Sequence, residues 1–203
     1  MKIICIGRNY IEHAKELNNP VPEKPVFFMK PDTALLQKNN PFFYPEFSKN
    51  VQYETELVLK ICRNGRHIEE NFAHKYYDEI GIGIDFTARD IQAECKKKGL
   101  PWEIAKAFDQ AAPVGIFIQK SEFPDMNNIH FQLKINNEIR QEGNSGNMIF
   151  GFDRIVSYIS NFITLKTGDL IFTGTPEGVG PTAINDHFEV FIEGKKLLEF
   201  NVK

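Results

Sequence analysis

The chain contains 203 residues, 42% of them hydrophobic, and its formal net charge at pH 7 is -3. This length supports one sizeable hydrophobic core, so we expect a single domain over residues 1–203, and no stretch approaches the roughly 20 apolar residues of a membrane span. The weakly acidic balance argues against a nucleic-acid or membrane partner, and the short basic run from Lys96 to Lys98 is interpreted as a solvated helix end.

The N-terminal segment combines a single lysine with a short apolar run, Ile3 to Ile6. A secretory leader has a longer apolar stretch followed by small residues, so we expect this run to form the first strand of the mature protein. Cys5, Cys62 and Cys95 are odd in number, far apart and without a Cys-x-x-Cys pair. That pattern is typical of reduced thiols in a cytosol, and we expect a cytoplasmic protein.

Three helices are predicted along the chain. The first spans Tyr10 to Asn18, with Asn9 as its cap. A second helix is expected to follow Thr87, which would cap it, and to end at Gly99. A third spans Asp153 to Phe162, where apolar residues recur with helical spacing.

Strand patterns dominate the rest of the chain. They lie at Val51 to Ile61, Ile80 to Ile84, Val114 to Gln119, His130 to Ile135, Leu170 to Thr173 and Phe188 to Ile192. Turn-forming pairs separate them, and two strands joined by such a turn would form a hairpin. These turn signals are Asn64-Gly65, Asn136-Asn137, Thr167-Gly168-Asp169 and Glu193-Gly194. The pattern predicts a mostly antiparallel, β-rich α+β fold with a few helices.

Two glutamates alternate with a threonine in the strand predicted over residues 53–59. Successive side chains of a strand point to opposite faces, so Glu54 and Glu56 share one face, roughly 7 Å apart at their Cα atoms. Two like charges beside apolar neighbours repel unless a cation or protons compensate them, and carboxylate oxygens suit Mg²⁺, Mn²⁺ or Ca²⁺. The alternative is the charged, solvated face of an edge strand.

A third carboxylate, Asp85, follows the apolar strand of residues 80–84 and precedes the second predicted helix. An acid at the end of a buried strand is a usual position for a ligand-binding group, and the glycines in that strand let other backbone approach closely. A local turn or a helix cap is the alternative. Arg89 can pair with Asp85 or Asp90, or with a substrate carboxylate.

Several segments resemble the fumarylacetoacetate hydrolase family, in the family's order and over nearly the whole chain. They are GRNYIEHAKEL (7–17), FFMKP (27–31), YETELVL (53–59), GIGIDFTARDIQAECKKKGLPWEIAKAFDQAAPVG (81–115) and LKTGDLIFTGTPEGVGP (165–181). The CKKKGLPW and NMIF segments and Asn185-Asp186 are most similar to the short acylpyruvase and oxaloacetate decarboxylase members. The resemblance implies the mixed β-roll of the family's C-terminal domain, a homodimer, and Mg²⁺ or Mn²⁺ held by Glu54, Glu56 and Asp85.

His13 and Glu16 lie three residues apart in the first predicted helix and therefore share a face. Without the resemblance they would be interpreted as a surface pair. The stretch NYIEHAKE is similar to the lid of the short members, in which this pair acts as a catalytic dyad. The glutamate would orient the imidazole and raise its basicity, as a general base requires.

Roles are also expected for four other polar residues. The resemblance implies that Lys106, otherwise interpreted as a surface lysine, points into the site and stabilises enolate charge, and that Arg89 and Gln92 contact substrate. Thr175 lies in a glycine-rich segment without a Walker ending, so we expect its backbone to approach a small oxyanion. The other histidines show no metal-like spacing with an acid and are expected at the surface; they are His67, His74, His130 and His187.

Together the residues and the resemblance predict a divalent-metal-dependent hydrolase that cleaves acylpyruvates to pyruvate and a carboxylate. Decarboxylation of oxaloacetate is a further expected activity, and the ligand is a small 2-oxo acid. One alternative is an isomerase, decarboxylase or hydratase of unsaturated 2-oxo diacids, such as a 2-hydroxyhepta-2,4-diene-1,7-dioate isomerase, which could dispense with the dyad. The other is a metal-stabilised scaffold without turnover, which would tolerate His13→Ala.

Overall fold

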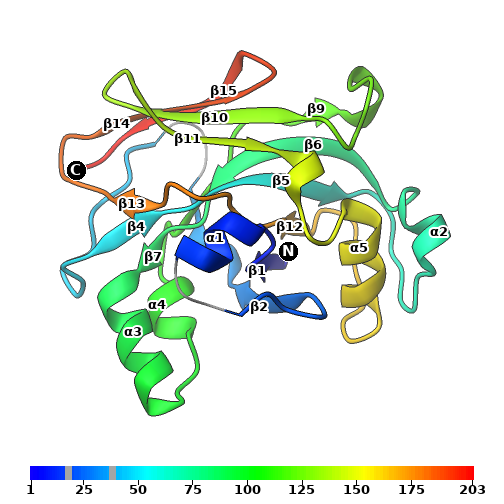
Figure 1. The fold of residues 1–203 in the computed structure, drawn as a ribbon, viewed down its shortest axis with the longest axis horizontal. Coiled ribbons are helices and arrows are strands. Elements are labelled where there is room, and N and C mark those ends of the chain that lie inside the picture. Colours follow the sequence, from blue (N-terminus) through cyan, green and yellow to red (C-terminus); the bar gives the residue numbers. More distant parts are fainter. Residues whose placement is uncertain (17–19, 37–39) are drawn as a thin grey trace.

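The computed structural model describes residues 1–16, 20–36 and 40–203 (Figure 1). Its largest sheet has six strands, in the order β2 (Val26–Lys30), β1 (Ile3–Gly7), β12 (Leu170–Phe172), β5 (Thr55–Ile61), β6 (Tyr77–Ile84) and β9 (Ile118–Gln119). Neighbouring strands pair antiparallel except β1 and β12, which run parallel. The predicted first strand is therefore an interior strand of the main sheet.

A second sheet has four antiparallel strands, in the order β11 (Glu138–Asn144), β10 (His130–Ile135), β14 (His187–Ile192) and β15 (Lys195–Asn201). Two of the predicted turns close hairpins in it, Asn136-Asn137 between β10 and β11 and Glu193-Gly194 between β14 and β15. The φ angles are 53° and 68° in the first turn and 47° and 73° in the second. Two-residue hairpin turns need this left-handed geometry.

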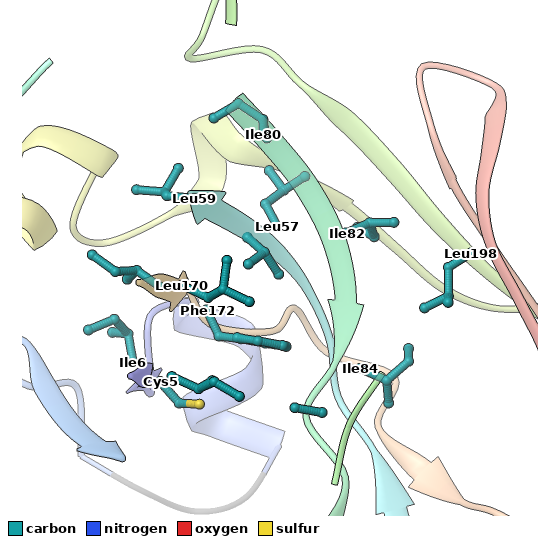
Figure 2. Close-up of a cluster of buried hydrophobic side chains, with 14 of the residues drawn as sticks. Cys5, Ile6, Leu57, Leu59, Ile80, Ile82, Ile84, Leu170, Phe172 and Leu198 are labelled. Carbon is teal, nitrogen blue, oxygen red and sulfur yellow. The ribbon is translucent and has the colours of Figure 1, made fainter. Parts of the chain in front are cut away.

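The hydrophobic core includes the contact between the two sheets. Strands β14 and β15 both pack against β6. Figure 2 shows Leu198 of β15 pointing toward Ile82 and Ile84 of β6, and all three side chains are buried. A Cβ added to Gly83 would lie 2.8 Å from the carbonyl oxygen of Pro113. This strand glycine allows a close backbone approach, as its sequence context predicted.

The remaining elements are short. The small sheets join β13 (Gly180–Pro181), β4 (Val51–Tyr53) and β7 (Thr87–Ala88), and β3 (Leu35–Leu36) with β8 (Ala112–Pro113). The helices are α1 (Ile11–Glu16), α2 (Glu70–Ala73), α3 (Arg89–Lys98), α4 (Glu103–Lys106) and α5 (Phe152–Ser160), with 3-10 turns at Asp32–Ala34, Lys120–Glu122 and Ser145–Asn147. The predicted β-rich α+β class with mixed sheets and short helices is confirmed. None of the described helices has the length and apolarity to cross a membrane.

Both predicted helix caps are wrong. The Asn9 side chain is buried and donates to the carbonyl oxygens of Phe150 (3.0 Å) and Thr173 (2.7 Å), so tertiary contacts use the polar group that would have capped α1. Thr87 lies in β7, and α3 starts without a side-chain cap. The end of α3 at Gly99 agrees with the prediction, because this residue has the left-handed φ of 65° that favours glycine.

Some predicted strands and turns are also corrected. The strand expected from Val51 to Ile61 is interrupted at Glu54, between β4 and β5. In the strand expected from Val114 to Gln119, Val114 forms an isolated bridge with Gly83, and only the last two residues form a strand, β9. Asn64-Gly65 and Gly168-Asp169 do not close hairpins, since α2 follows the first and the second leads into β12. The first helix agrees with its prediction up to residue 16, and residues 17 and 18 lie outside the described residues.

Candidate active site

Three buried carboxylates converge where β5 begins and β6 ends. Glu54 occupies the break between β4 and β5, Glu56 is the second residue of β5, and Asp85 directly follows β6. The antiparallel register places Glu56 opposite Gly83, and the Asp85 N–H donates to the Glu54 carbonyl oxygen at 2.8 Å. One carboxylate oxygen from each of the three residues lies within 4.8 Å of the others. The structure thus brings the three predicted metal ligands together.

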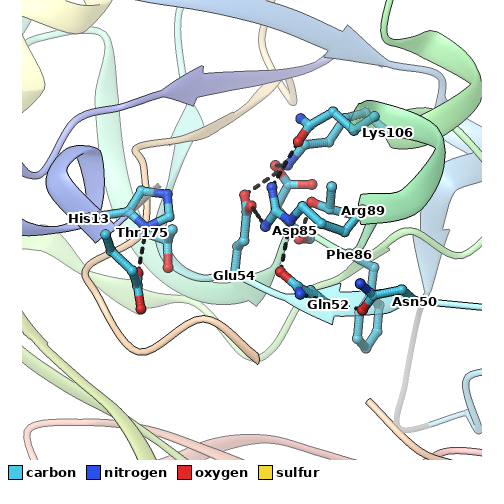
Figure 3. Close-up of polar contacts among 12 residues, drawn as sticks. His13, Asn50, Gln52, Glu54, Asp85, Phe86, Arg89, Lys106 and Thr175 are labelled. Atoms are coloured by element: carbon cyan, nitrogen blue, oxygen red, sulfur yellow. Dashed lines mark hydrogen bonds and ion pairs between the residues drawn. The ribbon is translucent and has the colours of Figure 1, made fainter. Parts of the chain in front are cut away.

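Three cations contact two of these carboxylates, and Figure 3 shows two of them, Arg89 and Lys106. The Lys106 Nζ lies 2.7 Å from Glu54 Oε2 and 2.8 Å from Asp85 Oδ2. The Arg89 guanidinium pairs with Glu54 Oε1 at 2.5 Å. The Nζ atom of Lys30, whose side chain is fully buried, lies 2.8 Å from Asp85 Oδ1. Glu54 and Asp85 therefore have positive partners within the protein itself.

Glu56 differs from its two neighbours. Within the described part of the chain no cationic side chain forms an ion pair with it, and its Oε2 accepts a hydrogen bond from the Gly174 N–H at 2.6 Å. Burial is the largest cause that raises the pKa of Glu56 well above its usual value, and repulsion from Asp85 and Glu54 raises it further. Burial acts on Glu54 too, but the neighbouring Lys106 and Arg89 charges lower its pKa. A divalent ion would supply the positive charge that Glu56 lacks, so this oxygen donor set fits Mg²⁺ or Mn²⁺.

The predicted dyad lies on α1. The His13 Nδ1 is 3.2 Å from Glu16 Oε2, and His13 is only 4% exposed. A carboxylate can only accept a hydrogen bond, so Glu16 favours the ring proton on Nδ1 and leaves Nε2 able to take a proton. Glu16 Oε1 also accepts from the Gly178 N–H at 3.1 Å, which ties α1 to the glycine-rich segment.

Asn9 positions the start of α1 beside that segment. Besides the two bonds that its amide group donates, its Oδ1 accepts from the Phe150 N–H at 2.8 Å and its carbonyl oxygen accepts from the Ile149 N–H at 2.8 Å. A Cβ at Gly174, where φ is 99°, would lie 2.6 Å from the Asn9 Cβ. Glycine is therefore required at this point for the two segments to approach each other.

One pocket connects the predicted site residues. In Figure 3, His13 and Thr175 lie on one side of Glu54, and Lys106 and Arg89 lie on the other. Glu16 and Asp85 do not line the pocket themselves, but they bond to the lining residues His13 and Lys106. The predicted residues that line the pocket are His13, Glu54, Glu56, Arg89, Gln92, Lys106 and Thr175.

Lys30 is a site residue that sequence reasoning missed. Besides Asp85, its ammonium contacts the carbonyl oxygens of Phe86 (3.2 Å), Lys106 (2.5 Å) and Ala111 (2.9 Å). These bonds fix Asp85 and the end of α4 relative to β2. The available signal was a lysine at the end of an apolar strand, just before a proline.

Gln141 on β11 was also missed, and its sequence neighbours give no signal. It is 2% exposed, and its Oε1 accepts from the N–H of Thr55, which lies between two of the carboxylates. Its Nε2 donates to Thr175 Oγ1 and to the Pro176 carbonyl oxygen, both at 3.0 Å. One amide group therefore joins the acidic strand to the segment that carries Thr175.

Gln141→Leu should destabilise the protein by about 1–3 kcal/mol, because it leaves the buried Thr55 N–H and loop carbonyl without partners. It should also weaken Mg²⁺ binding, since the acidic strand loses its support. Denaturant unfolding and calorimetric Mg²⁺ titration measure the two effects. Gln132→Leu on β10 is the matched control, because that amide bonds to Glu142 at the surface. Equal effects in the two variants would contradict the role of Gln141.

His67, His74 and His130 are exposed as expected, and His187 is partly exposed and belongs to a possible metal-binding group that its spacing along the chain does not indicate. His187, Glu189 and Glu199, which are partly exposed, offer ligand atoms within 4.8 Å of one another. The Lys196 Nζ lies 3.0 Å from Glu189 Oε1 and 2.7 Å from Glu199 Oε2. A lysine thus already compensates these acids, and the pairing of β14 with β15 explains a proximity that spacing along the chain does not reveal.

The family model described as Fumarylacetoacetate (FAA) hydrolase C-terminal matches residues 2–203. The chain belongs to the fumarylacetoacetate hydrolase family and is an enzyme of that family. It is 45% identical over 201 residues to the mitochondrial oxaloacetate tautomerase FAHD1 of Mus musculus, covering 99% of this chain and 91% of that protein. The Arabidopsis thaliana protein of the same name is 40% identical over 202 residues, covering 100% and 91%.

Solved structures show the same fold with several activities. The fumarylpyruvate hydrolase from Pseudomonas aeruginosa, in complex with Mn²⁺ and pyruvate, superposes with a TM-score of 0.93 and 36% identity, covering 100% of this chain and 89% of that one. The 2-hydroxyhepta-2,4-diene-1,7-dioate isomerase from Mycobacterium marinum gives a TM-score of 0.86 and 34% identity, covering 99% and 73%. The family is thus certain, while the reaction differs among its members.

Proposed function

We propose that this chain is a divalent-metal-dependent enzyme that forms and stabilises the enolate of a small 2-oxo acid. Its reaction is the hydrolysis of acylpyruvates to pyruvate and a carboxylate. The observation that carries the proposal is the pocket itself, in which His13, Lys106 and the carboxylates of Glu54 and Glu56 all line one space. A base, a cation and an oxygen donor set are the components that enolate chemistry requires.

Glu54, Glu56 and Asp85 would hold the ion, Mg²⁺ or Mn²⁺. When bound, the ion polarises the carbonyl of a 2-oxo acid. The Pseudomonas aeruginosa relative, in complex with Mn²⁺ and pyruvate, supports this assignment. Arg89, Gln92 and Thr175 then orient the substrate along the wall of the pocket. The Arg89 guanidinium donates to Gln92 Oε1 at 2.8 Å, so these two side chains form one polar surface.

In acylpyruvate hydrolysis the His13 Nε2 takes a proton from water while the water oxygen attacks the distal carbonyl carbon. Collapse of the adduct breaks the bond between that carbon and C3, and the electron pair passes to the pyruvate enolate. The Lys106 ammonium stabilises the enolate charge. The His13 imidazolium, held by Glu16, returns the proton to C3, which completes pyruvate.

A second candidate reaction is the keto–enol tautomerisation of oxaloacetate, which the names of the Mus musculus and Arabidopsis thaliana relatives favour. Here His13 Nε2 would take the proton from C3 and the 2-oxo oxygen would gain one, so that a C3–H bond breaks, an O–H bond forms and no carbon–carbon bond is broken. Decarboxylation of oxaloacetate would lead to the same enolate through loss of CO₂. These reactions share one charge distribution, so one pocket can support them.

The two alternatives are less well supported. An isomerase of unsaturated 2-oxo diacids has a relative in the Mycobacterium marinum enzyme, but the bond between the buried His13 and Glu16 favours a reaction that uses a base on α1. A scaffold without turnover gives no reason for burying a histidine, a lysine and three acids around one pocket.

Two further properties belong to the proposal. We propose a homodimer, and an exposed apolar groove that includes Leu35, Val114, Ile116 and Leu197 offers a surface for it. We also propose a reducing, cytoplasmic environment, since Cys5, Cys62 and Cys95 are all free thiols. The single domain of residues 1–203 would then carry all the residues named above.

EDTA treatment should abolish pyruvate release from acetylpyruvate, and Mg²⁺ or Mn²⁺ should restore it, because Glu54, Glu56 and Asp85 would hold the ion that polarises the substrate carbonyl. The measurement follows pyruvate from acetylpyruvate and from oxaloacetate, and enol loss from oxaloacetate by absorbance. Pyruvate from acetylpyruvate identifies the hydrolase, while enol loss without pyruvate identifies the tautomerase. A folded protein that binds Mg²⁺ but acts on neither substrate would favour the isomerase instead.

A further inference from the structure

Two cations in the pocket lining have no role in the chemistry described above. The lining holds four cationic side chains, Arg8, Arg89, Lys96 and Lys106, together with the carboxylates of Glu54 and Glu56. Arg89 and Lys106 pair with Glu54. Among the described residues, no acid forms an ion pair with the other two cations.

Lys96 lies on the pocket face of α3. Arg89, Gln92 and Lys96 follow one another at spacings of three and four residues, so their side chains share one face of the helix. At its first residue, Arg89, this face contacts the Glu54 carboxylate. Lys96 lies about 10 Å beyond Arg89 along the helix axis. The Lys96 Nζ lies 5.4 Å from the centroid of the Trp102 ring, which also lines the pocket.

The adjacent lysines behave differently. Lys98 pairs with Glu94 on the solvent side of the helix, and Lys97 is exposed and absent from the pocket lining. The interpretation of this run as a solvated helix end agrees with the exposure of all three lysines, but Lys96 differs from the other two because it also lines the pocket. Partial burial is the largest cause that lowers the pKa of Lys96, and repulsion from Arg89 and Arg8 lowers it further. This agrees with several cations lying close together in the pocket lining.

Arg8 reaches the same region from the other side, where β1 leads toward α1. Its φ is 60°, a left-handed conformation that non-glycine residues rarely adopt. Such strain persists where the surrounding structure holds it, and it is concentrated at functional sites. Here it accompanies a guanidinium that lines the pocket.

We propose that Arg8 and Lys96 form an anion subsite that binds a carboxylate at the far end of the substrate, so that the enzyme prefers 2-oxo dicarboxylates to 2-oxo monocarboxylates of equal length. This inference rests on the proposed function, in which the other end of the substrate faces Glu54, Glu56 and Asp85. The carboxylate would relieve the repulsion between unpaired cations and form charge-assisted hydrogen bonds with both. A methyl group at the same end would leave both cations without a partner.

The test uses 2-oxoglutarate and 2-oxopentanoate, which share a five-carbon chain and differ in the terminal carboxylate. Each is titrated calorimetrically into the Mg²⁺-loaded protein. We expect 2-oxoglutarate to bind at least about tenfold more tightly, the effect of one charged hydrogen bond. Lys96→Met and Arg8→Asn should each reduce this preference about tenfold and leave 2-oxopentanoate unaffected. Asparagine is chosen for position 8 because it tolerates a left-handed backbone.

Lys97→Met is the matched control and should keep the full preference. As a second readout, Lys96→Met should raise the KM for oxaloacetate about tenfold while the KM for acetylpyruvate, which has a neutral end, stays unchanged. An unchanged preference in both subsite variants would overturn the inference and leave the proposed function intact. If neither 2-oxo acid binds the Mg²⁺-loaded wild type, the proposed function fails and the subsite fails with it.

Discussion

Glu56→Gln should abolish Mg²⁺ binding, reduce turnover of 2-oxo acids at least about a hundredfold, and yet stabilise the metal-free protein. The carboxylate is buried beside Glu54 and Asp85, and burial and these two charges raise its pKa. Because the pKa of Glu56 is raised in the folded state, the metal-free protein loses stability as the pH rises through that folded-state pKa. Ionised Glu56 therefore destabilises the metal-free fold. Glutamine removes that charge and keeps an acceptor for the Gly174 N–H.

Thermal unfolding in EDTA and in Mg²⁺ measures this effect. In EDTA at neutral pH the Tm of Glu56→Gln should exceed that of the wild type by at least about 2 °C, and the difference should vanish in acid, where Glu56 is protonated in both states. Mg²⁺ should raise the Tm of the wild type alone. Glu79→Gln on β6 is the control, because that acid pairs with Lys60 outside the site. A variant that melts below the wild type in EDTA would contradict this account of Glu56.

His13→Ala should lower kcat for acetylpyruvate hydrolysis by about 10²–10⁴-fold, the contribution of a general base. Its affinity for Mg²⁺ should stay unchanged, because His13 is not among the three carboxylates that would hold the ion. Pyruvate release and calorimetric Mg²⁺ titration provide the two readouts. Lys15→Ala is the control on the exposed side of α1, where Lys15 pairs with Glu12. Unaffected hydrolysis in His13→Ala would exclude the dyad from the reaction.

The sequence predicted the parts of the site that depend on local geometry. Strand alternation placed Glu54 and Glu56 together, and helical spacing placed His13 beside Glu16; the structure shows both pairs. The meeting of Asp85 with the glutamates needs the pairing of β5 with β6, which no local pattern specifies. For Asp85, the family resemblance predicted a place beside the two glutamates that spacing along the chain could not predict.

The failures have a common cause in contacts between distant segments. Asn9 and Thr87 have the chemistry of helix caps, but one bonds to Phe150 and Thr173 and the other joins a small sheet. Gln141 was missed because its partners lie more than thirty positions away in the chain. Local propensity cannot predict such partners, because the same side chain would form a hydrogen bond with nearby backbone if its distant partner were absent.

The parallel pairing of β1 with β12 has a consequence for how the protein is made. Residues 3–5 pair with residues 170–172, and Gly174 and Gly178 supply the N–H groups that bind Glu56 and Glu16. A ribosome must therefore synthesise most of the chain before the first strand, which can pair early with β2, finds its second neighbour, β12. Contacts of such long sequence separation form slowly. The nascent chain thus carries its acids, its histidine and its lysine before the pocket exists, and these residues are brought together only after β12 has joined the six-stranded sheet.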